Sequence, residues 1–267
     1  MNRKELVSQI RQKKSYLCVG LDTEFNKIPK HLRSDPDAIF QFNKKIIDST
    51  KDLCVAYKIN TAFYESQGIP GWEALEETVN YIPSTHFKIA DAKRGDIGNT
   101  SSQYAKAFFE TLQFNAVTVA PYMGEDSVKP FLEYKDKWTI VLGLTSNPGA
   151  KDFEQLTTGD EKLYEKVIRT CSTWGNPDNL MFVVGANRLE QFEKIRSIIP
   201  DHFFLVPGVG AQGGSLKDIS QNAMNVECGL LVNASRAIIF ASQNEDFGEA
   251  ARAVASEYQK EMQNYLL

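Results

Sequence analysis

The sequence alternates between short apolar runs and longer amphipathic stretches, and this unit repeats eight times along the chain. Buried parallel strands read as continuous apolar runs because helices cover both faces of the sheet. Eight strand-then-helix units close most economically as a (β/α)8 barrel, a fold that needs roughly 250 residues. The runs that we predict to be strands cover residues 16–22, 53–60, 87–90, 116–120, 139–144, 180–185, 203–207 and 229–233.

We therefore predict a single (β/α)8 barrel domain over residues 1–267, with a short amphipathic helix at its N-terminus within residues 1–14. A doubly wound open sheet is the structural alternative, although no G-x-G-x-x-G motif follows the first predicted strand. The amphipathic stretches predict helices over residues 39–47, 72–81 and 103–109, and helices that begin at Asp126, Glu161, Arg188, Ser215 and Phe247.

Charged residues gather where the first three predicted strands end. The third strand runs into the motif DAKRGDIG, in which Asp91 and Lys93 are two residues apart and face the same way in an extended chain, while Asp96 follows in a glycine-flanked turn. Asp22 and Lys58 close the first two strands. A solvated turn with a surface ion pair is the simpler interpretation of this motif alone. Because barrel enzymes carry their chemistry at the carboxyl ends of the strands, we instead predict one charged site at the barrel mouth, with the ammonium group of Lys93 buried between carboxylates.

The last two predicted strands lead into a candidate phosphate site. The seventh is followed by the glycine-rich segment 207–214, and the eighth by Arg236. Glycines allow backbone N–H groups to approach a phosphate, and a guanidinium group presents a planar pair of donors to it. Loops after strands seven and eight are the usual phosphate grip of such barrels, so we predict phosphate binding here.

A long polar segment, residues 145–160, follows the fifth predicted strand. A βα loop of this length is either a disordered surface insertion or a lid. Its place at the predicted mouth favours a lid that carries a hydroxyl and an amide for a polar ring.

Composition excludes several classes of partner. A net charge of −4 gives no broad basic surface, so no nucleic-acid partner is predicted. No apolar run approaches the roughly 20 residues that cross a bilayer, and the N-terminal segment lacks the apolar stretch of a secretory signal. The cysteines have no C-x-x-C spacing and are predicted to be reduced core residues of a cytoplasmic protein. The three histidines lack ligand spacing and are predicted on the surface or in loops: His31, His86 and His202.

With these pieces placed, the sequence resembles the orotidine 5'-phosphate decarboxylase family, in the longer branch whose signature reads DAKRGDIG. The resemblance covers essentially the whole chain. Its motifs are GLD at 20–22, Lys58 with Asn60, DAKRGDIGNT at 91–100, TSNP at 145–148, PGVGAQGG at 207–214 and SRAI at 235–238.

The resemblance implies a function and a role for each matching residue. The substrate would be orotidine 5'-monophosphate, and the products uridine 5'-monophosphate and carbon dioxide, with no cofactor or metal. Lys93 would protonate the ring carbon, Asp91 would lie against the departing carboxylate, and Lys58 would complete the charged array. Asp96 and Thr100 would reach the active site of the partner subunit in a homodimer. The substrate-binding residues would be Asp22 on a ribose hydroxyl, Asn60, Ser146 on the pyrimidine with Thr145 as the alternative, Gln212 and Arg236 on the phosphate, and Ser235.

Three other functions compete with this one. A Schiff-base aldolase also uses a barrel lysine and a phosphate grip, but Lys93 lies in sequence between two acids that favour its charged form. A Mg²⁺-dependent sugar-phosphate enzyme of the same superfamily would carry a metal-binding acid where this chain has Lys58. A non-catalytic nucleotide-binding barrel would tolerate loss of the lysines.

Overall fold

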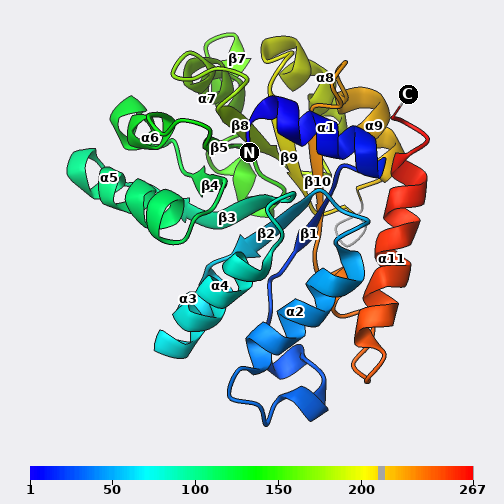
Figure 1. The fold of residues 1–267 in the computed structure, drawn as a ribbon. Coiled ribbons are helices and arrows are strands. Elements are labelled where there is room, and N and C mark those ends of the chain that lie inside the picture. The colour runs from blue at the N-terminus through cyan, green and yellow to red at the C-terminus, as the bar shows by residue number, and fades with distance from the viewer. Residues whose placement is uncertain (210–213, 267) are drawn as a thin grey trace.

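The structure is a computed structural model that describes residues 1–209 and 214–266. Its centre is a closed barrel of parallel strands, in the order β1, β2, β3, β4, β5, β8, β9, β10 and back to β1 (Figure 1). This closure confirms the predicted (β/α)8 barrel, and the open-sheet alternative is wrong. The strands are β1 (Leu17–Gly20), β2 (Ala56–Asn60), β3 (Phe87–Arg94), β4 (Ala116–Val119), β5 (Trp138–Leu144), β8 (Leu180–Val184), β9 (Phe203–Pro207) and β10 (Leu230–Ala234).

Helices surround the barrel. The predicted helices begin within three residues of their predicted positions, except α5, which begins five residues earlier, and the short helices α3 and α10 were not predicted. They are α1 (Arg3–Lys13), α2 (Ala38–Thr50), α3 (Ala62–Glu65), α4 (Ile69–Tyr81), α5 (Gly98–Lys106), α6 (Glu125–Leu132), α7 (Leu163–Ser172), α8 (Leu189–Ile198), α9 (Leu216–Ala223), α10 (Arg236–Ile239) and α11 (Phe247–Met262). The helix predicted from Glu161 begins two residues later, because β7 (Glu161–Lys162) first pairs with β6 (Thr157–Thr158) in a short antiparallel hairpin.

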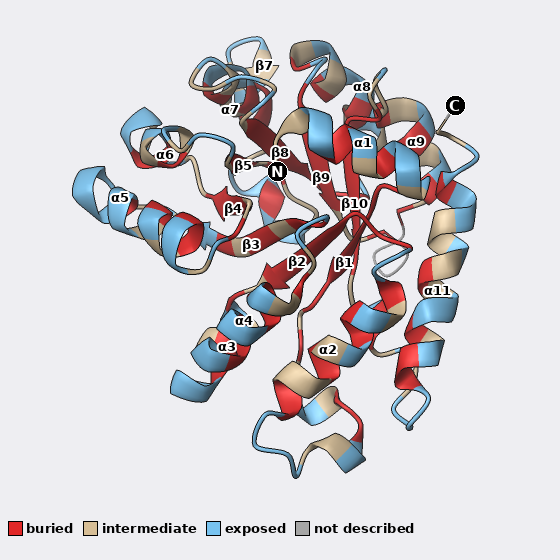
Figure 2. Cartoon of the chain, viewed as in Figure 1, coloured by how far each residue is buried: buried red, intermediate tan, exposed pale blue. Residues whose placement is uncertain are grey.

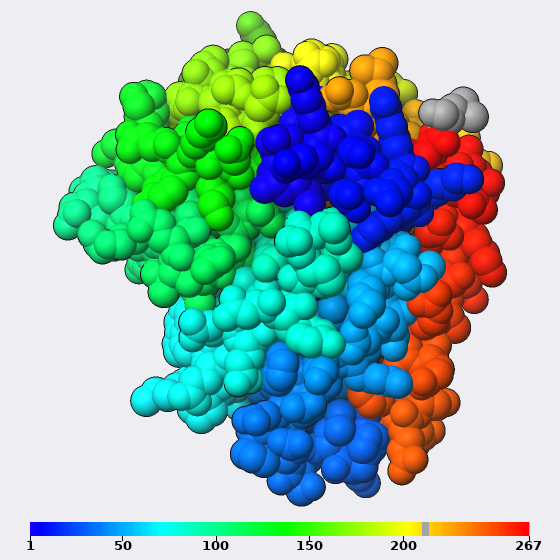
Figure 3. Space-filling view, viewed as in Figure 1, coloured from blue at the N-terminus to red at the C-terminus, as the bar shows by residue number. Residues whose placement is uncertain are grey.

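Helix α1 covers the end of the barrel where the strands begin. Arg3 donates to the carbonyl oxygens of Pro177 (2.6 Å) and Asp201 (2.8 Å), which precede β8 and β9. Lys13 donates to the carbonyl of Cys54 (2.9 Å), which precedes β2. In Figure 3 this blue helix lies beside the red C-terminal segment on the surface of the molecule. Because α1 caps this end, the opposite end is left for a site.

The strands are buried on both sides, whereas the helices are buried mainly on the side that faces them (Figure 2). A few polar side chains interrupt the apolar interior near the carboxyl ends of the strands, and Lys58, Thr118 and Asn233 are among them. A buried polar group is costly unless it is paired, so these residues mark the region with a role other than packing.

The remaining sequence predictions about packing are partly confirmed. All four cysteines are free and buried. The histidines lie outside the barrel strands, as predicted, and His86 and His202 are buried in the loops before β3 and β9. No helix in the described part of the chain is both long enough and apolar enough to span a membrane.

Candidate active site

The motif after the third strand forms a bulge rather than a regular strand end. The register between β3 and β4 shifts between Ala90 and Arg94, and Lys93 has a φ of +47°. A left-handed backbone costs roughly 1–2 kcal/mol for a residue with a side chain, so the surrounding contacts must hold it. The bulge keeps the side chain of Lys93 on the same side as that of Asp91, as the sequence predicted, but by a turn of the backbone rather than by strand alternation.

Two lysines and two acids form a continuous charged array at the carboxyl ends of the first three strands. Lys58 Nζ lies 3.1 Å from Asp22 Oδ1 and 3.0 Å from Asp91 Oδ2. Lys93 Nζ lies 2.6 Å from Asp91 Oδ1. The side chain of Lys58 is 4% exposed, that of Asp91 is 12% exposed and that of Lys93 is 50% exposed. Asp91 is therefore shared between a buried ammonium group and one that faces solvent.

The side chains of the array stay charged although burial disfavours charged groups. Burial by itself would raise the pKa of Asp91, but the ammonium groups of Lys58 and Lys93 outweigh it and keep this pKa well below its ordinary value. Burial would likewise lower the pKa of Lys58, and the carboxylates of Asp91 and Asp22 outweigh it and raise this pKa above its ordinary value. Both groups are therefore charged at neutral pH.

One prediction about this array needs correction. We expected the ammonium group of Lys93 to be buried between two carboxylates, but half of its side chain is exposed. Within the described residues Asp96 forms no ion pair with Lys93, and its Oδ1 instead accepts the backbone N–H of Ile97 (2.7 Å). The buried lysine of the array is Lys58. Lys93 itself lies in the bulge, where the register between β3 and β4 shifts.

Sequence reasoning missed a buried threonine in contact with the array. The hydroxyl of Thr118 donates to Asp91 Oδ1 (3.1 Å) and accepts the backbone N–H of Lys93 (2.9 Å). The signal in the sequence was a single polar residue inside the apolar run of the fourth strand.

The opposite side of the site is built from β10 and its loop. Ser235 Oγ donates to the carbonyl of Gly20 (3.0 Å), and a Cβ atom on Gly20 would lie only 2.6 Å from Ser235 Cβ. Glycine at position 20 thus lets β1 and the loop after β10 approach each other. Arg236 is exposed at the rim, and Asn233, also missed from the sequence, has a buried Oδ1 without a partner among the described residues.

These two sides enclose a cavity of about 150 Å³. It is lined by Asp22, Lys58 and Asp91 on one side and by residues 207–209 and 233–237 on the other. The structure therefore brings together the charged array and the predicted phosphate loops. Gln212, the other predicted phosphate residue, lies outside the described residues.

The segment after β5 has a defined conformation. The carboxylate of Glu154 accepts the backbone N–H and the hydroxyl of Thr145, each at 2.7 Å. Asn187 donates to the carbonyl of Ser146 (3.0 Å), and Arg188 donates to that of Thr145 (3.0 Å). These contacts join the segment to the loop after β8, so the disordered-insertion interpretation is wrong.

The other predicted residues are more dispersed. Asn60 ends β2 opposite Asp91, and its Oδ1 accepts the backbone N–H of Ala62 (3.2 Å). Thr100 lies exposed in the first turn of α5. Ile97, just before α5, is 56% exposed, and Tyr122, in the loop between β4 and α6, is 91% exposed. Asp96 and Thr100 therefore lie close in sequence to an exposed apolar side chain and do not line the cavity.

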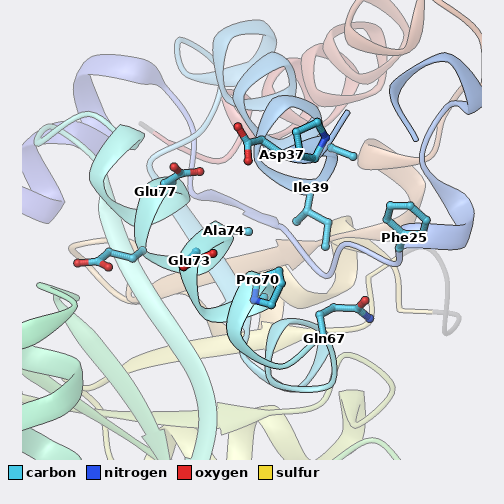
Figure 4. Close-up of a pocket in the computed structure, with 12 residues that line it drawn as sticks. Phe25, Asp37, Ile39, Gln67, Pro70, Glu73, Ala74 and Glu77 are labelled. Atoms are coloured by element: carbon cyan, nitrogen blue, oxygen red, sulfur yellow. The ribbon is translucent and has the colours of Figure 1, made fainter. Parts of the chain in front are cut away.

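A larger hollow, of about 490 Å³, lies between the start of α2 and helix α4 (Figure 4). Phe25, Ile39 and Pro70 line it together with acidic side chains such as Glu73 and Glu77. None of the predicted site residues lines this hollow, so we place the candidate active site at the smaller cavity.

The array can stabilise negative charge and supply a proton. Lys93 combines a half-exposed ammonium group with a carboxylate neighbour, and Lys58 binds the other oxygen of that carboxylate. Among the described residues, no group of three or more His, Cys, Asp or Glu side chains is placed to hold a metal ion.

Comparison with known proteins identifies relatives along the whole chain. The model of a family described as "Orotidine 5'-phosphate decarboxylase / HUMPS family" matches residues 15–254. An orotidine 5'-phosphate decarboxylase of Flavobacterium johnsoniae is 58% identical over 98% of this chain and 97% of its own. One of Bacteroides fragilis is 57% identical over 100% of this chain and 98% of its own.

Among solved structures, UMP synthase of Leishmania donovani aligns with a TM-score of 0.88 and 38% identity. The alignment covers 100% of this chain and 56% of that longer one. The match therefore extends to the fold as well as to the sequence.

Proposed function

Because this chain belongs to the orotidine 5'-phosphate decarboxylase / HUMPS family, we propose that its charged array at the barrel mouth is the catalytic centre of the decarboxylase. The reaction converts orotidine 5'-monophosphate to uridine 5'-monophosphate and carbon dioxide, a step of pyrimidine biosynthesis. The observation that carries the site proposal is the alternation of charge from Asp22 through Lys58 and Asp91 to Lys93.

The chemistry explains why such an array is needed. When the bond between the ring and its carboxylate breaks, the electron pair stays on the ring carbon, in the plane of the ring, where the π system cannot delocalise it. The protein must stabilise this charge electrostatically, by preorganised charges in a site that excludes water. The ammonium group of Lys93 faces the charge as it develops and then transfers a proton to the same carbon, after which Lys93 is reprotonated from solvent.

Asp91 and Lys58 serve this proton donor in different ways. Asp91 lies against Lys93 and fixes the direction of its ammonium group. It also borders the cavity where the departing carboxylate of the substrate would lie. Lys58, buried behind Asp91, keeps that carboxylate charged and in place. The roles of these three residues remain our proposal.

The residues that line the cavity suggest which of them bind the ribose and the phosphate of the substrate. Asp22 and Asn60, at the ends of β1 and β2, are proposed to bind ribose hydroxyls. Arg236 and Ser235, across the cavity, are proposed to bind the phosphate together with Gln212. Binding energy gained at the phosphate, far from the reacting carbon, is available for orienting the ring and closing the lid.

The lid geometry favours Ser146 over Thr145 as the pyrimidine contact. The hydroxyl of Thr145 is engaged inside the lid by Glu154. The backbone of Ser146 is held by Asn187 and packs against Gly185, where an added Cβ atom would lie 2.8 Å from Ser146 Cβ. Its position is therefore tightly set, while its hydroxyl has no partner among the described side chains and is available to a ring.

We also propose a homodimer in which Asp96 and Thr100 complete the partner subunit's site. The half-exposed ammonium group of Lys93 leaves room for a second carboxylate. Ile97, which follows Asp96, and Tyr122, in the loop after β4, are exposed and supply apolar surface for an interface. In the same way, the four free, buried cysteines support our expectation of a cytoplasmic enzyme, and the single barrel supports one domain over residues 1–267.

The catalytic proposal is tested by following the ultraviolet absorbance of orotidine 5'-monophosphate with purified protein in EDTA. We expect turnover with EDTA present. Lys93→Ala is expected to keep measurable binding of uridine 5'-monophosphate and to lose several orders of magnitude of turnover. Unchanged turnover in Lys93→Ala would remove Lys93 from the mechanism and support a non-catalytic nucleotide-binding barrel.

The same assay distinguishes a metal-dependent enzyme and a Schiff-base aldolase from the proposed decarboxylase. Activity that disappears in EDTA and returns with Mg²⁺ would indicate the metal-dependent type of enzyme. Borohydride trapping of substrate on Lys93 would indicate a Schiff base.

The dimer proposal has its own test, in which Lys93→Ala and Asp96→Ala proteins are mixed and allowed to exchange subunits. If Asp96 acts across the interface, each mixed dimer regains one intact site, so about a quarter of the sites in an equal mixture recover. Recovery of no activity on mixing, with subunit exchange verified, would place Asp96 in the site of its own chain or outside any site.

A further inference from the structure

We propose that Thr118 is a positioning residue that sets the relative placement of Asp91 and Lys93. The inference rests on the proposed roles of those two residues and adds to them a group that touches both. Thr118 lies on β4, next to the bulged end of β3, and is fully buried.

A threonine hydroxyl has one proton to donate and two lone pairs that can accept. The backbone N–H of Lys93 occupies one lone pair at 2.9 Å. The proton is then directed to Asp91 Oδ1, 3.1 Å away. A single hydroxyl thus joins the backbone of the proton donor to the carboxylate of its partner.

The bulge explains why this bond is needed. The register shift takes Lys93 out of the regular pairing between β3 and β4, so its N–H has no place in the ladder. The Thr118 hydroxyl receives that N–H and holds a residue whose φ of +47° is otherwise unfavourable. The same hydroxyl and the Lys93 ammonium group both bind Asp91 Oδ1, while Lys58 binds Oδ2, so each oxygen of this carboxylate is fixed.

Two conservative substitutions separate this role from packing. Thr118→Val keeps the shape and removes the hydroxyl, whereas Thr118→Ser keeps the hydroxyl and removes the methyl group. If the hydroxyl positions the two groups, kcat falls about 10- to 100-fold in the valine variant, the range expected for loss of a hydrogen bond to a charged group, and returns to nearly the wild-type value in the serine variant. A packing role predicts the reverse order, with valine near wild type and serine impaired.

Thr139 provides a matched control. It is also a fully buried threonine, on the neighbouring strand β5, but its hydroxyl has no partner among the described residues. Thr139→Val is expected to leave kcat unchanged. Urea unfolding of every variant shows that it is folded, and the Kd for uridine 5'-monophosphate is expected to stay within about threefold in Thr118→Val, since the hydroxyl does not touch the ligand.

Wild-type turnover in Thr118→Val, or a serine variant as slow as the valine variant, would overturn the inference. Lys93→Ala is measured beside them, to separate this failure from failure of the proposed function. If Lys93→Ala also retains turnover, the site assignment itself is wrong. If Lys93→Ala is inactive and Thr118→Val is not, only the role of Thr118 is wrong.

Discussion

Replacement of Lys58 by methionine tests whether the buried ammonium group holds the array together. Methionine is an unbranched side chain of nearly the same length, and it removes the charge together with the hydrogen bonds that the ammonium group donates. Lys58 Nζ lies 3.1 Å from Asp22 and 3.0 Å from Asp91, with its side chain only 4% exposed. At an effective dielectric constant of about 20, unit charges 3 Å apart attract by about 5 kcal/mol, and desolvation of the ammonium group cancels part of this.

The net effect follows from the partners that are left behind. In the Lys58→Met variant Asp22 loses its ion pair, and Asp91 keeps the ion pair with Lys93 and the hydrogen bond from Thr118. Removal of one member of a buried pair leaves an uncompensated charge and typically costs about 3–5 kcal/mol of unfolding free energy. We expect a loss in this range by urea titration. Turnover should fall at least about 100-fold, because Asp91 loses one of the groups that hold it beside the proposed proton donor.

Lys45→Met is the matched control for this measurement. Lys45 Nζ lies 3.0 Å from Glu249 Oε1, the same separation as in the array, but both side chains are exposed to solvent. Water screens an exposed pair, so this variant is expected to lose far less stability and no turnover. If Lys58→Met and Lys45→Met lost the same unfolding free energy, burial of the Lys58 ion pairs would not explain their contribution to stability. If Lys58→Met retained full turnover, the array would not be the catalytic centre.

Three further outcomes follow from the structure. Burial lowers the pKa of His202 to about 4, so between this value and the unfolded value of about 6.5 the unfolded chain binds more protons. His202 should therefore contribute about 1–2 kcal/mol to the fall in unfolding free energy from pH 7 to pH 5, and the fall should be smaller by this amount in His202→Phe, as urea titrations at the two pH values would measure. Ser146→Ala should lower kcat/KM at least about 10-fold, whereas wild-type kinetics in Ser146→Ala would transfer the pyrimidine contact to Thr145. In Gly185→Ala the new Cβ would lie 2.8 Å from Ser146 Cβ, so this variant should lower kcat/KM in the same assay without weakening phosphate binding. Wild-type kinetics in this variant would mean that the position of Ser146 does not affect the reaction.

Much of the fold could be predicted because burial leaves a simple pattern. Strands covered on both faces are apolar throughout, so runs such as 180–184 stand out between amphipathic helices. The largest departure was the start of α5, which lies at Gly98 rather than at residue 103, while α7 begins two residues later than predicted. Residues 161–162 pair with 157–158, and a hairpin of two-residue strands leaves almost no periodic signal.

Part of the candidate site could be predicted from the sequence for a different reason. Lysine and aspartate at the ends of buried strands are costly unless they are paired, so Lys58 and Asp91 drew attention as soon as a barrel was predicted. The burial of each charge could not be predicted in the same way. Strand alternation treats Asp91 and Lys93 alike, yet one is nearly buried and the other is half exposed.

The sequence by itself determined which strands would end together, and hence that Asp22, Lys58 and Asp91 would meet, because parallel strands in a closed barrel place all their carboxyl ends at one mouth. Tertiary structure alone decided how those groups are joined. The bulge at Lys93 and the hydroxyl of Thr118 depend on contacts between neighbouring strands, 25 residues apart in the chain. Hydrogen bonds of this kind follow from the register of two strands and the direction of one side chain, and no pattern of residue types along a single strand specifies either.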